Sequence, residues 1–153
     1  MTSRAAIDAF LAHPAIAIVG VSRSGKKFGN IARRTLRDKG YRVYPIHPSA
    51  PVIDGDRCYA RFADLPERVA AALIVVPPDR ARRVVEDAAA AGIRHVWLQQ
   101  GAESVEAEIA GDKLGLNVIC GECILMFADP KGIHKAHRWV RRVLRTLPAA
   151  GRP

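Results

Sequence analysis

The stretch AIAIVGVSRSGKKFGNIARRTLRDKG, residues 15–40, joins a short apolar run to an amphipathic segment through a loop rich in glycine and lysine. The apolar run 15–20 predicts a buried strand. Asn30 is a good N-cap and Gly40 a good helix terminator, so we expect a helix over 30–39. A strand, a loop and a helix in this order are typical of the first unit of an α/β sheet.

The rest of the chain repeats this alternation. Apolar runs rich in valine and isoleucine predict four further strands, at 41–46, 71–76, 94–99 and 116–121. Helical patterns are expected at 3–12, 79–91, 103–114 and 133–147, and a turn or two at 65–71. Near-continuous apolar strands between amphipathic helices indicate parallel strands covered on both faces. The sequence therefore predicts an α/β fold: a Rossmann-like doubly wound sheet of about five parallel strands with helices on both faces.

Length and composition indicate one globular domain. The 153 residues fit a single domain, expected over 1–147, with a frayed tail at 148–153. No apolar run approaches the roughly 20 residues of a membrane-spanning helix, and the N-terminus lacks a signal-peptide pattern. We therefore expect a cytoplasmic protein with no membrane partner, whose three cysteines are reduced thiols.

Much of the formal charge of +9 comes from the C-terminal segment. From Lys131 to the end there are seven basic residues and no acidic one. The predicted helix 133–147 has an apolar stripe and a basic face, which is typical of a solvated surface. The alternatives are contacts to a ligand's phosphates from a neighbouring subunit, or an interaction module for an anionic partner. Nucleic acid is disfavoured because no RNA- or DNA-reading motif accompanies the helix.

The loop GVSRSGKK, residues 20–27, has the composition of a phosphate-binding turn but matches neither common pattern. It fits the P-loop at Gly20, Gly25 and Lys26, but Lys27 stands where a hydroxyl should reach magnesium. Against the dinucleotide pattern G-x-G-x-x-G, Ser22 replaces the second glycine. These departures disfavour magnesium-dependent NTP hydrolysis and NAD binding.

The end of the second strand also disfavours NAD. A NAD-binding unit normally places an acid there to hold the ribose hydroxyls, but this strand runs into His47 and Pro48, with no carboxylate before Asp54. Ligands of doubly wound sheets bind at the carboxyl ends of the strands, which directs attention to loops 20–30, 47–55, 77–80 and 99–103. The first of these offers helix amides, two serine hydroxyls and three cations to an anion. A solvated connection with no ligand remains the alternative.

The four loops together carry a family resemblance. They contain the G-x-S turn at 20–22, the strand that ends at Pro48 and is followed by Gly55, the VPP at 76–78, and W-x-Q-x-G from Trp97 to Gly101. Over about residues 12–127 the chain resembles the small bacterial and archaeal CoA-binding proteins. It is also similar, more distantly, to the CoA-binding domain that opens the alpha subunit of succinyl-CoA synthetase.

The resemblance implies a set of residues that bind coenzyme A or an acyl-CoA. Contact with the CoA phosphates is implied for Gly20, Val21, Ser22, Arg23 and Ser24, and the charge of Lys26 in the same loop would add to this site. His47 and Pro48 would border the adenosine, and Val76, Pro77 and Pro78 would line the wall beside the adenine or the pantetheine arm. Gln99 and Gln100 would face the mouth of the cleft. The synthetase's phosphate-accepting histidine lies in a second domain, so the resemblance implies binding without catalysis, in a carrier, sensor or regulatory role.

The sequence is also compatible with other functions. His47 is the one titratable group expected at the cleft, where hydrogen bonding or capping is favoured over general-base catalysis, so no catalytic residue is assigned. An NADPH-dependent oxidoreductase, with His47 and nearby arginines on the 2′-phosphate, is an alternative. So is a basic interaction module that binds a protein partner through the C-terminal helix. A homodimer through the apolar run 123–127 is a further possibility.

A metal site is not expected. Cys120, Cys123, His134 and His137 form C-x2-C-x10-H-x2-H, but the histidine spacing is one residue short of the usual zinc pattern.

Overall fold

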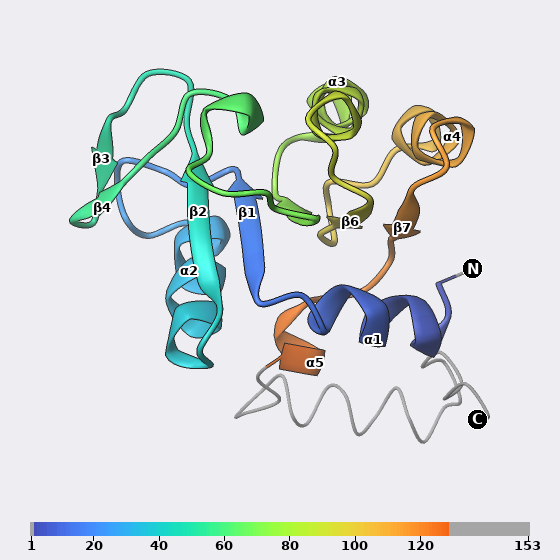
Figure 1. Ribbon diagram of the computed structural model, residues 1–153, viewed down its shortest axis with the longest axis horizontal. Helices are drawn as coiled ribbons and strands as arrows, with labels where there is room; N and C mark the ends of the chain where they lie inside the picture. Colours follow the sequence, from blue (N-terminus) through green and yellow to red (C-terminus); the bar gives the residue numbers. More distant parts are fainter. Residues whose placement is uncertain (1, 129–153) are drawn as a thin grey trace.

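A computed structural model describes residues 2–128, and its centre is a five-stranded parallel sheet in the order β2-β1-β5-β6-β7 (Figure 1). The strands are β1 (Ala15–Val19), β2 (Arg42–Ile46), β5 (Ala71–Ile74), β6 (His95–Leu98) and β7 (Asn117–Ile119). The chain builds outward from β1 to β2, then crosses back to β5 on the other side of β1. The strand order therefore reverses between β1 and β5, and the predicted doubly wound α/β fold is confirmed.

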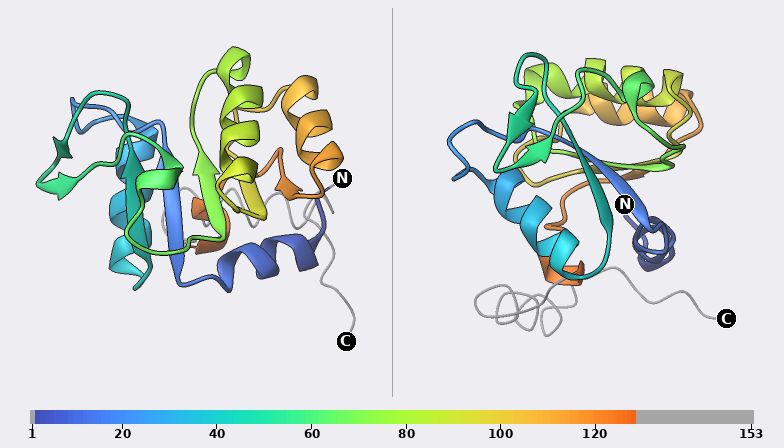
Figure 2. Two further views of the ribbon diagram at one scale, coloured as in Figure 1. Left: turned by 45° about the horizontal axis from the view of Figure 1, so that its top comes forward. Right: turned by 60° about the vertical axis from the view of Figure 1, so that its left-hand side comes forward.

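Helices cover both faces of the sheet, as Figures 1 and 2 show. One face carries α1 (Arg4–Leu11), α2 (Phe28–Asp38) and α5 (Leu125–Ala128), and the other carries α3 (Pro78–Ala90) and α4 (Val105–Lys113). Alternate residues of β1 enter the two cores: Ile16 and Ile18 face α1 and α2, whereas Ala15 and Ala17 belong to the core under α3 and α4. Burial on both faces explains why the central strands are continuously apolar.

Two helices begin earlier than the sequence predicts. Helix α2 starts at Phe28, with Lys27 at the N-cap position and no side-chain cap, so Asn30 lies inside the helix. Helix α3 starts at Pro78 and not at Asp79. Proline is well suited to the first helical position, because its missing N–H has no partner there in any helix. The opening helix α1 follows the expectation.

The segment between β2 and β5 differs most from the prediction. The turn expected at 65–71 is absent, and a 3₁₀ turn, η1, lies earlier at Phe62–Asp64. A hairpin of two short strands, β3 (Val52–Ile53) and β4 (Asp56–Arg57), was not predicted. Its turn residues Asp54 and Gly55 have φ values of 50° and 79°, the left-handed geometry of a two-residue hairpin turn.

The predicted helix 133–147 and tail 148–153 lie outside the described residues. Within residues 2–128, no helix is both long and apolar enough to cross a bilayer.

Candidate functional site

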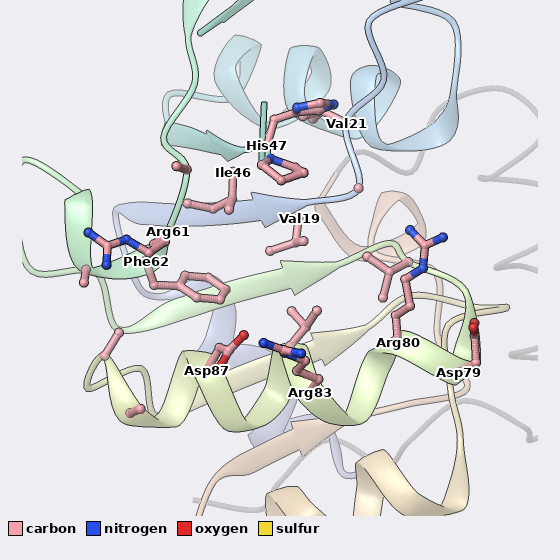
Figure 3. Close-up of a pocket in the computed structure, with 18 residues that line it drawn as sticks. Val19, Val21, Ile46, His47, Arg61, Phe62, Asp79, Arg80, Arg83 and Asp87 are labelled. Atoms are coloured by element: carbon pink, nitrogen blue, oxygen red, sulfur yellow. The ribbon is translucent and has the colours of Figure 1, made fainter. Parts of the chain in front are cut away.

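A cleft opens at the carboxyl ends of β1, β2 and β5, where the strand order reverses. It comprises a larger cavity of about 940 Å³ and a smaller one of about 520 Å³, and ligand pockets typically measure roughly 300–1,000 Å³. The larger cavity lies between η1 and α3 (Figure 3), and the smaller one is lined by the loop after β1. The residues that line both are Gly20, Val21, His47, Val76 and Arg80. The two cavities are therefore adjoining parts of one cleft.

Two glycines set the path of the chain from β1 to α2. Gly20 has φ +109°, and a Cβ there would lie 2.0 Å from the backbone oxygen of Val75. A Cβ on Gly29 would lie 2.5 Å from the backbone oxygen of Gly20. Both contacts are too close for any side chain, so the loop packs tightly between the start of α2 and the end of β5. This close packing places the N-terminus of α2 beside the cleft.

Asn30 holds the loop from within α2. Its side chain donates from Nδ2 to the backbone oxygen of Ser22 and accepts at Oδ1 from the backbone N–H of Ser22, both at 2.9 Å. The hydroxyl of Ser22 in turn lies 3.0 Å from that of Ser24 and accepts from the backbone N–H of Ser24 at 3.2 Å. The loop is thus shaped by its own hydrogen bonds. The side chain of Asn30 is therefore used to hold the loop and does not cap α2.

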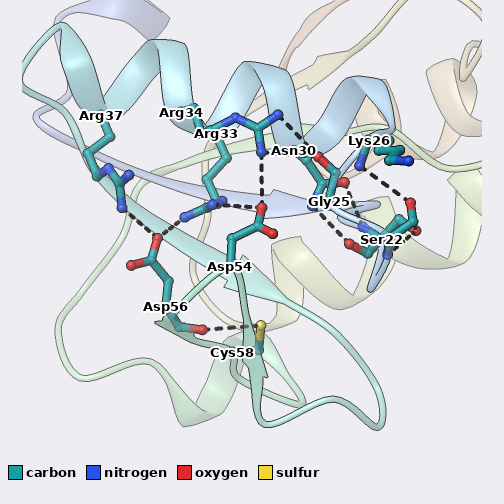
Figure 4. Close-up of polar contacts among 11 residues, drawn as sticks. Ser22, Gly25, Lys26, Asn30, Arg33, Arg34, Arg37, Asp54, Asp56 and Cys58 are labelled. Carbon is teal, nitrogen blue, oxygen red and sulfur yellow. Dashed lines mark hydrogen bonds and ion pairs between the residues drawn. The ribbon is translucent and has the colours of Figure 1, made fainter.

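Ion pairs between α2 and the β3–β4 hairpin also stabilise the loop after β1 (Figure 4). Arg34 donates to the backbone oxygen of Gly25 at 3.0 and 3.1 Å, and to Asp54 of the β3–β4 hairpin at 3.0 Å. Arg33, only 1% exposed, forms ion pairs with Asp54 at 3.1 Å and with Asp56. Arg37 also pairs with Asp56, at 2.8 Å. The hairpin is therefore fastened to both α2 and the loop.

The smaller cavity is suited to an anion. The charged side chains that line it are Arg23, Lys27 and Arg80, and no carboxylate of the described residues does so. The first turn of α2 next to it has neither a side-chain cap nor an acidic residue, which leaves backbone N–H groups without a capping partner. Cations and uncapped helix amides together create a positive potential at this end of the cleft.

The larger cavity combines an apolar wall with a charged rim. Val19, Ile46, Phe62 and Val84 contribute apolar surface. The charged lining residues have both signs: Arg61, Asp79, Arg80, Arg83 and Asp87. Figure 3 shows the ring of Phe62 over β5, on the side of the sheet that carries α3. This cavity fits a flat or apolar group with polar substituents better than a second bare anion.

His47 supplies a hydrogen-bond donor where the two cavities meet. Its Nδ1 accepts from the backbone N–H groups of Ser49 at 3.2 Å and Ala50 at 2.9 Å, so the ring proton lies on Nε2. Burial, and then the positive charge of Arg23, lower the pKa of His47 below its usual value. The imidazole is therefore neutral at pH 7 and caps the turn after β2. In this tautomer Nε2 donates and cannot act as a base.

The structure brings most of the predicted site residues together. Those that line the cleft are Gly20, Val21, Ser22, Arg23, His47, Pro48, Val76 and Pro77. Five others are absent from the lining of both cavities: Ser24, Lys26, Pro78, Gln99 and Gln100. Gln99 is buried and accepts from the backbone N–H of Ile124 at 3.1 Å, and Gln100 donates to the backbone oxygen of Gly121 at 3.3 Å. Both glutamines join β6 to the segment after β7.

The wall formed by α3 was not predicted from the sequence. Arg80, Arg83, Val84 and Asp87 all line the larger cavity. They recur at i, i+3, i+4 and i+7, which places them on one face of the predicted helix 79–91. That periodicity was the available signal. Phe62, by contrast, begins the three-residue 3₁₀ turn η1, which is too short for a periodic pattern to identify it.

No metal centre is found in the described part of the chain, where no three ligating side chains cluster. Cys120 and Cys123 are free thiols, whereas His134 and His137 lie outside the described residues. Burial, followed by the nearby Glu108 carboxylate, raises the pKa of Cys120. A high pKa keeps this thiol protonated and unreactive at neutral pH.

Comparison with known proteins relates the part of the chain that forms the cleft to one family. The sequence profile of the family described as CoA binding domain matches residues 14–129. A hypothetical protein from Pyrococcus horikoshii has a similar structure, with a TM-score of 0.75, 28% identity, and coverage of 82% of this chain and 88% of that one. A conserved hypothetical protein from Pyrococcus furiosus has a TM-score of 0.68 and 38% identity, covering 72% of this chain and 96% of that one.

One curated relative is an acetate–CoA ligase (ADP-forming) from Methanocaldococcus jannaschii, 30% identical over 86 residues. The match covers 56% of this chain but only 12% of the length of that ligase.

Proposed function

The chain belongs to the CoA binding domain family, and we propose on this basis that it binds coenzyme A or an acyl-CoA in the cleft at the switch point of its sheet. The observation that carries the proposal is the smaller cavity, where an uncapped helix N-terminus and three cations meet without any carboxylate of the described residues. Such a site favours a ligand with more than one phosphate charge.

We assign the diphosphate of CoA to the smaller cavity. Arg23 and Lys27 lie on the loop side of this cavity, and the positive pole of α2 adds to their charge. The hydrogen bonds of Asn30 and Ser22 hold the loop in one shape before any ligand arrives. Pre-formed donors contribute more to affinity than donors that must be ordered on binding.

The larger cavity is assigned to the adenosine. Phe62, Ile46 and Val84 offer apolar surface to the base, while His47 and Pro48 border it from the end of β2. No carboxylate follows β2 at the position where a NAD-binding unit holds its ribose hydroxyls. A ribose that carries a phosphate, as in CoA, would therefore meet no repulsion there. Val76 and Pro77 would lie beside the start of the pantetheine arm.

We infer a binding role, as a carrier, sensor or regulatory partner, and assign no reaction to the site. The chemistry of the lining supports this inference. His47 presents a bound proton at Nε2, so it is not available as a base for either serine of the loop. The hydroxyls of Ser22 and Ser24 hydrogen-bond to each other. The cleft thus offers donors and cations for recognition.

A thermal-shift titration tests the proposal. The full chain is titrated with CoA, acetyl-CoA, NAD, NADP and ATP at two salt concentrations. A ligand at 100 times its dissociation constant adds about 2.7 kcal/mol, which corresponds to roughly 5–10 °C for a domain of this size. We expect that shift with CoA and acetyl-CoA, weakened by salt, and smaller shifts with the other nucleotides.

The variant Ser22→Asp/Arg23→Glu supplies the mechanistic control. It places negative charge in the smaller cavity and should abolish the CoA shift. Arg82→Glu is matched to it, because Arg82 lies on α3 outside both cavities and pairs with Glu86 on the surface. Undiminished CoA binding by the double variant would refute the assignment of the diphosphate to this loop.

A further inference from the structure

Arg80 occupies a singular position in the cleft. It lies in the first turn of α3 and lines both the larger and the smaller cavity. Figure 3 shows its guanidinium group extending from α3 toward the loop that follows β1. Within residues 2–128 no carboxylate forms an ion pair with it, although Asp79 lines the larger cavity beside it. The guanidinium charge is therefore available to a ligand.

The residues common to both cavities mark where the two parts of a bound nucleotide must join. In a nucleotide the ribose links the diphosphate to the base. If the diphosphate lies in the smaller cavity and the base in the larger, the ribose lies at their junction. The junction residues are Gly20, Val21, His47, Val76 and Arg80. Arg80 is the one permanent charge among them, and the Nε2–H of His47 is a neutral donor.

We propose that Arg80 recognises a phosphate carried on the ribose itself, with His47 Nε2 as a second donor, and so selects nucleotides that bear this phosphate. The inference rests on the proposed function, because it requires the diphosphate in the smaller cavity. Two ligands share the chemistry: CoA carries the phosphate on the ribose 3′-oxygen and NADP carries it on the 2′-oxygen. The guanidinium fork suits phosphate geometry and can donate two parallel hydrogen bonds.

The position of Arg80 in the first turn of α3 argues against a stabilising role for its charge in the helix. A cation in the first turn of a helix faces the positive pole of the helix macrodipole and is unfavourable there. Arg80 therefore does not stabilise α3 through its charge, and no ion pair within the described residues compensates for this position. We expect Arg80→Met to unfold at the same or a higher temperature than the wild type when no ligand is present.

The test is isothermal titration calorimetry of the full chain with CoA and with dephospho-CoA, which lacks the 3′-phosphate. NADP and NAD form a second pair that differs in the 2′-phosphate. Each pair is measured on the wild type, on Arg80→Met and on Arg82→Met. Arg82 is the matched control because it lies on the same helix, exposed and outside the cleft.

For the wild type we expect CoA to bind roughly ten- to a hundredfold more tightly than dephospho-CoA, the range that a charge-assisted hydrogen-bond contact supplies. In Arg80→Met this ratio should fall toward one, because CoA loses affinity while dephospho-CoA keeps it. Arg82→Met should retain the wild-type ratio. If the affinity ratio of NADP to NAD depended on Arg80 in this way and that of CoA to dephospho-CoA did not, the ribose-phosphate site would be supported with NADP as its ligand.

Two results would overturn the inference while the proposed function survives. If Arg80→Met weakened CoA and dephospho-CoA equally, Arg80 would contact the diphosphate or the base. If Arg80→Met discriminated between them as well as the wild type does, another group would read the ribose phosphate. A wild-type chain that bound none of the four nucleotides would overturn the proposed function together with this inference.

Discussion

Replacing Asn30 with alanine tests whether the phosphate loop is held from inside α2. The change removes two hydrogen bonds of 2.9 Å to the backbone of Ser22 and leaves both of these backbone groups without their partner. At about 1 kcal/mol for each bond, with a further term for the small cavity left by a fully buried side chain, the loss is roughly 2–3 kcal/mol. The better helix propensity of alanine returns about 0.5 kcal/mol.

Urea denaturation and CoA titration measure the two consequences separately. We expect the free energy of unfolding to fall by about 2 kcal/mol, which lowers the melting temperature by roughly 4–8 °C. At 20 °C the variant remains folded, so any loss of CoA affinity there reports on the shape of the loop and not on global unfolding. We expect a loss of at least about tenfold, because the loop must then be ordered at the expense of binding energy.

Ile31→Ala is the control on the same helix. Ile31 is 43% exposed, so its truncation should cost under about 1 kcal/mol and leave CoA affinity unchanged. The reasoning fails if Asn30→Ala unfolds at the wild-type urea concentration, or if it loses stability but binds CoA as tightly as the wild type does. The second result would show that the loop keeps its shape without Asn30.

Three further predictions concern the scaffold of the cleft. Gly20→Ala should cost more than about 3 kcal/mol and abolish CoA binding in a calorimetric titration, because φ is +109° and the new Cβ would lie 2.0 Å from the Val75 oxygen; wild-type stability would contradict this. Asp54→Ala should cost roughly 1.5–3 kcal/mol in urea denaturation, because it removes one of the two carboxylates that pair with the buried Arg33; a cost below about 0.5 kcal/mol would show that Asp56 alone suffices. Because the pKa of His47 is lowered in the folded chain, the unfolded chain binds a proton at this histidine first as the pH falls. The contribution of neutral His47 to stability is therefore complete above pH ~6.5 and declines below it. In His47→Gln the urea midpoint should change less between about pH 5 and 7, and a pH dependence equal to that of the wild type would refute the assignment.

The sheet, the position of the cleft and the helical face of α3 that forms one wall follow from local sequence signals, but the Phe62 side of the cleft does not. The central strands β1 and β5 are continuously apolar because helices cover both faces, and this pattern is readable without tertiary information. The loop after β1 and the His47–Pro48 end of β2 could likewise be placed, since the carboxyl ends of parallel strands lie at one edge.

Long-range contacts account for the residues that were misplaced. Asn30 has the chemistry of an N-cap, yet its partner is Ser22 across the loop, and only the packing of Gly20 against Gly29 brings them together. The Asp54–Gly55 pair is a good hairpin signal, but strands of two residues carry no periodicity that could support it. Gln99 follows β6, at the edge of the sheet where ligand residues are expected, and in the structure its side chain accepts from the backbone N–H of Ile124 in the segment after β7.

The internal hydrogen bonds of the loop at residues 22–26 have a kinetic consequence. A loop that needs no rearrangement adds no slow conformational step to ligand capture, so the observed rate in a stopped-flow experiment should rise linearly with ligand concentration and show no plateau. The slope should be steered by the positive charge of Arg23, Lys27 and Arg80 and should therefore decline with salt. The residence time of the ligand, and not its rate of entry, would then be the quantity that substitutions in the cleft alter.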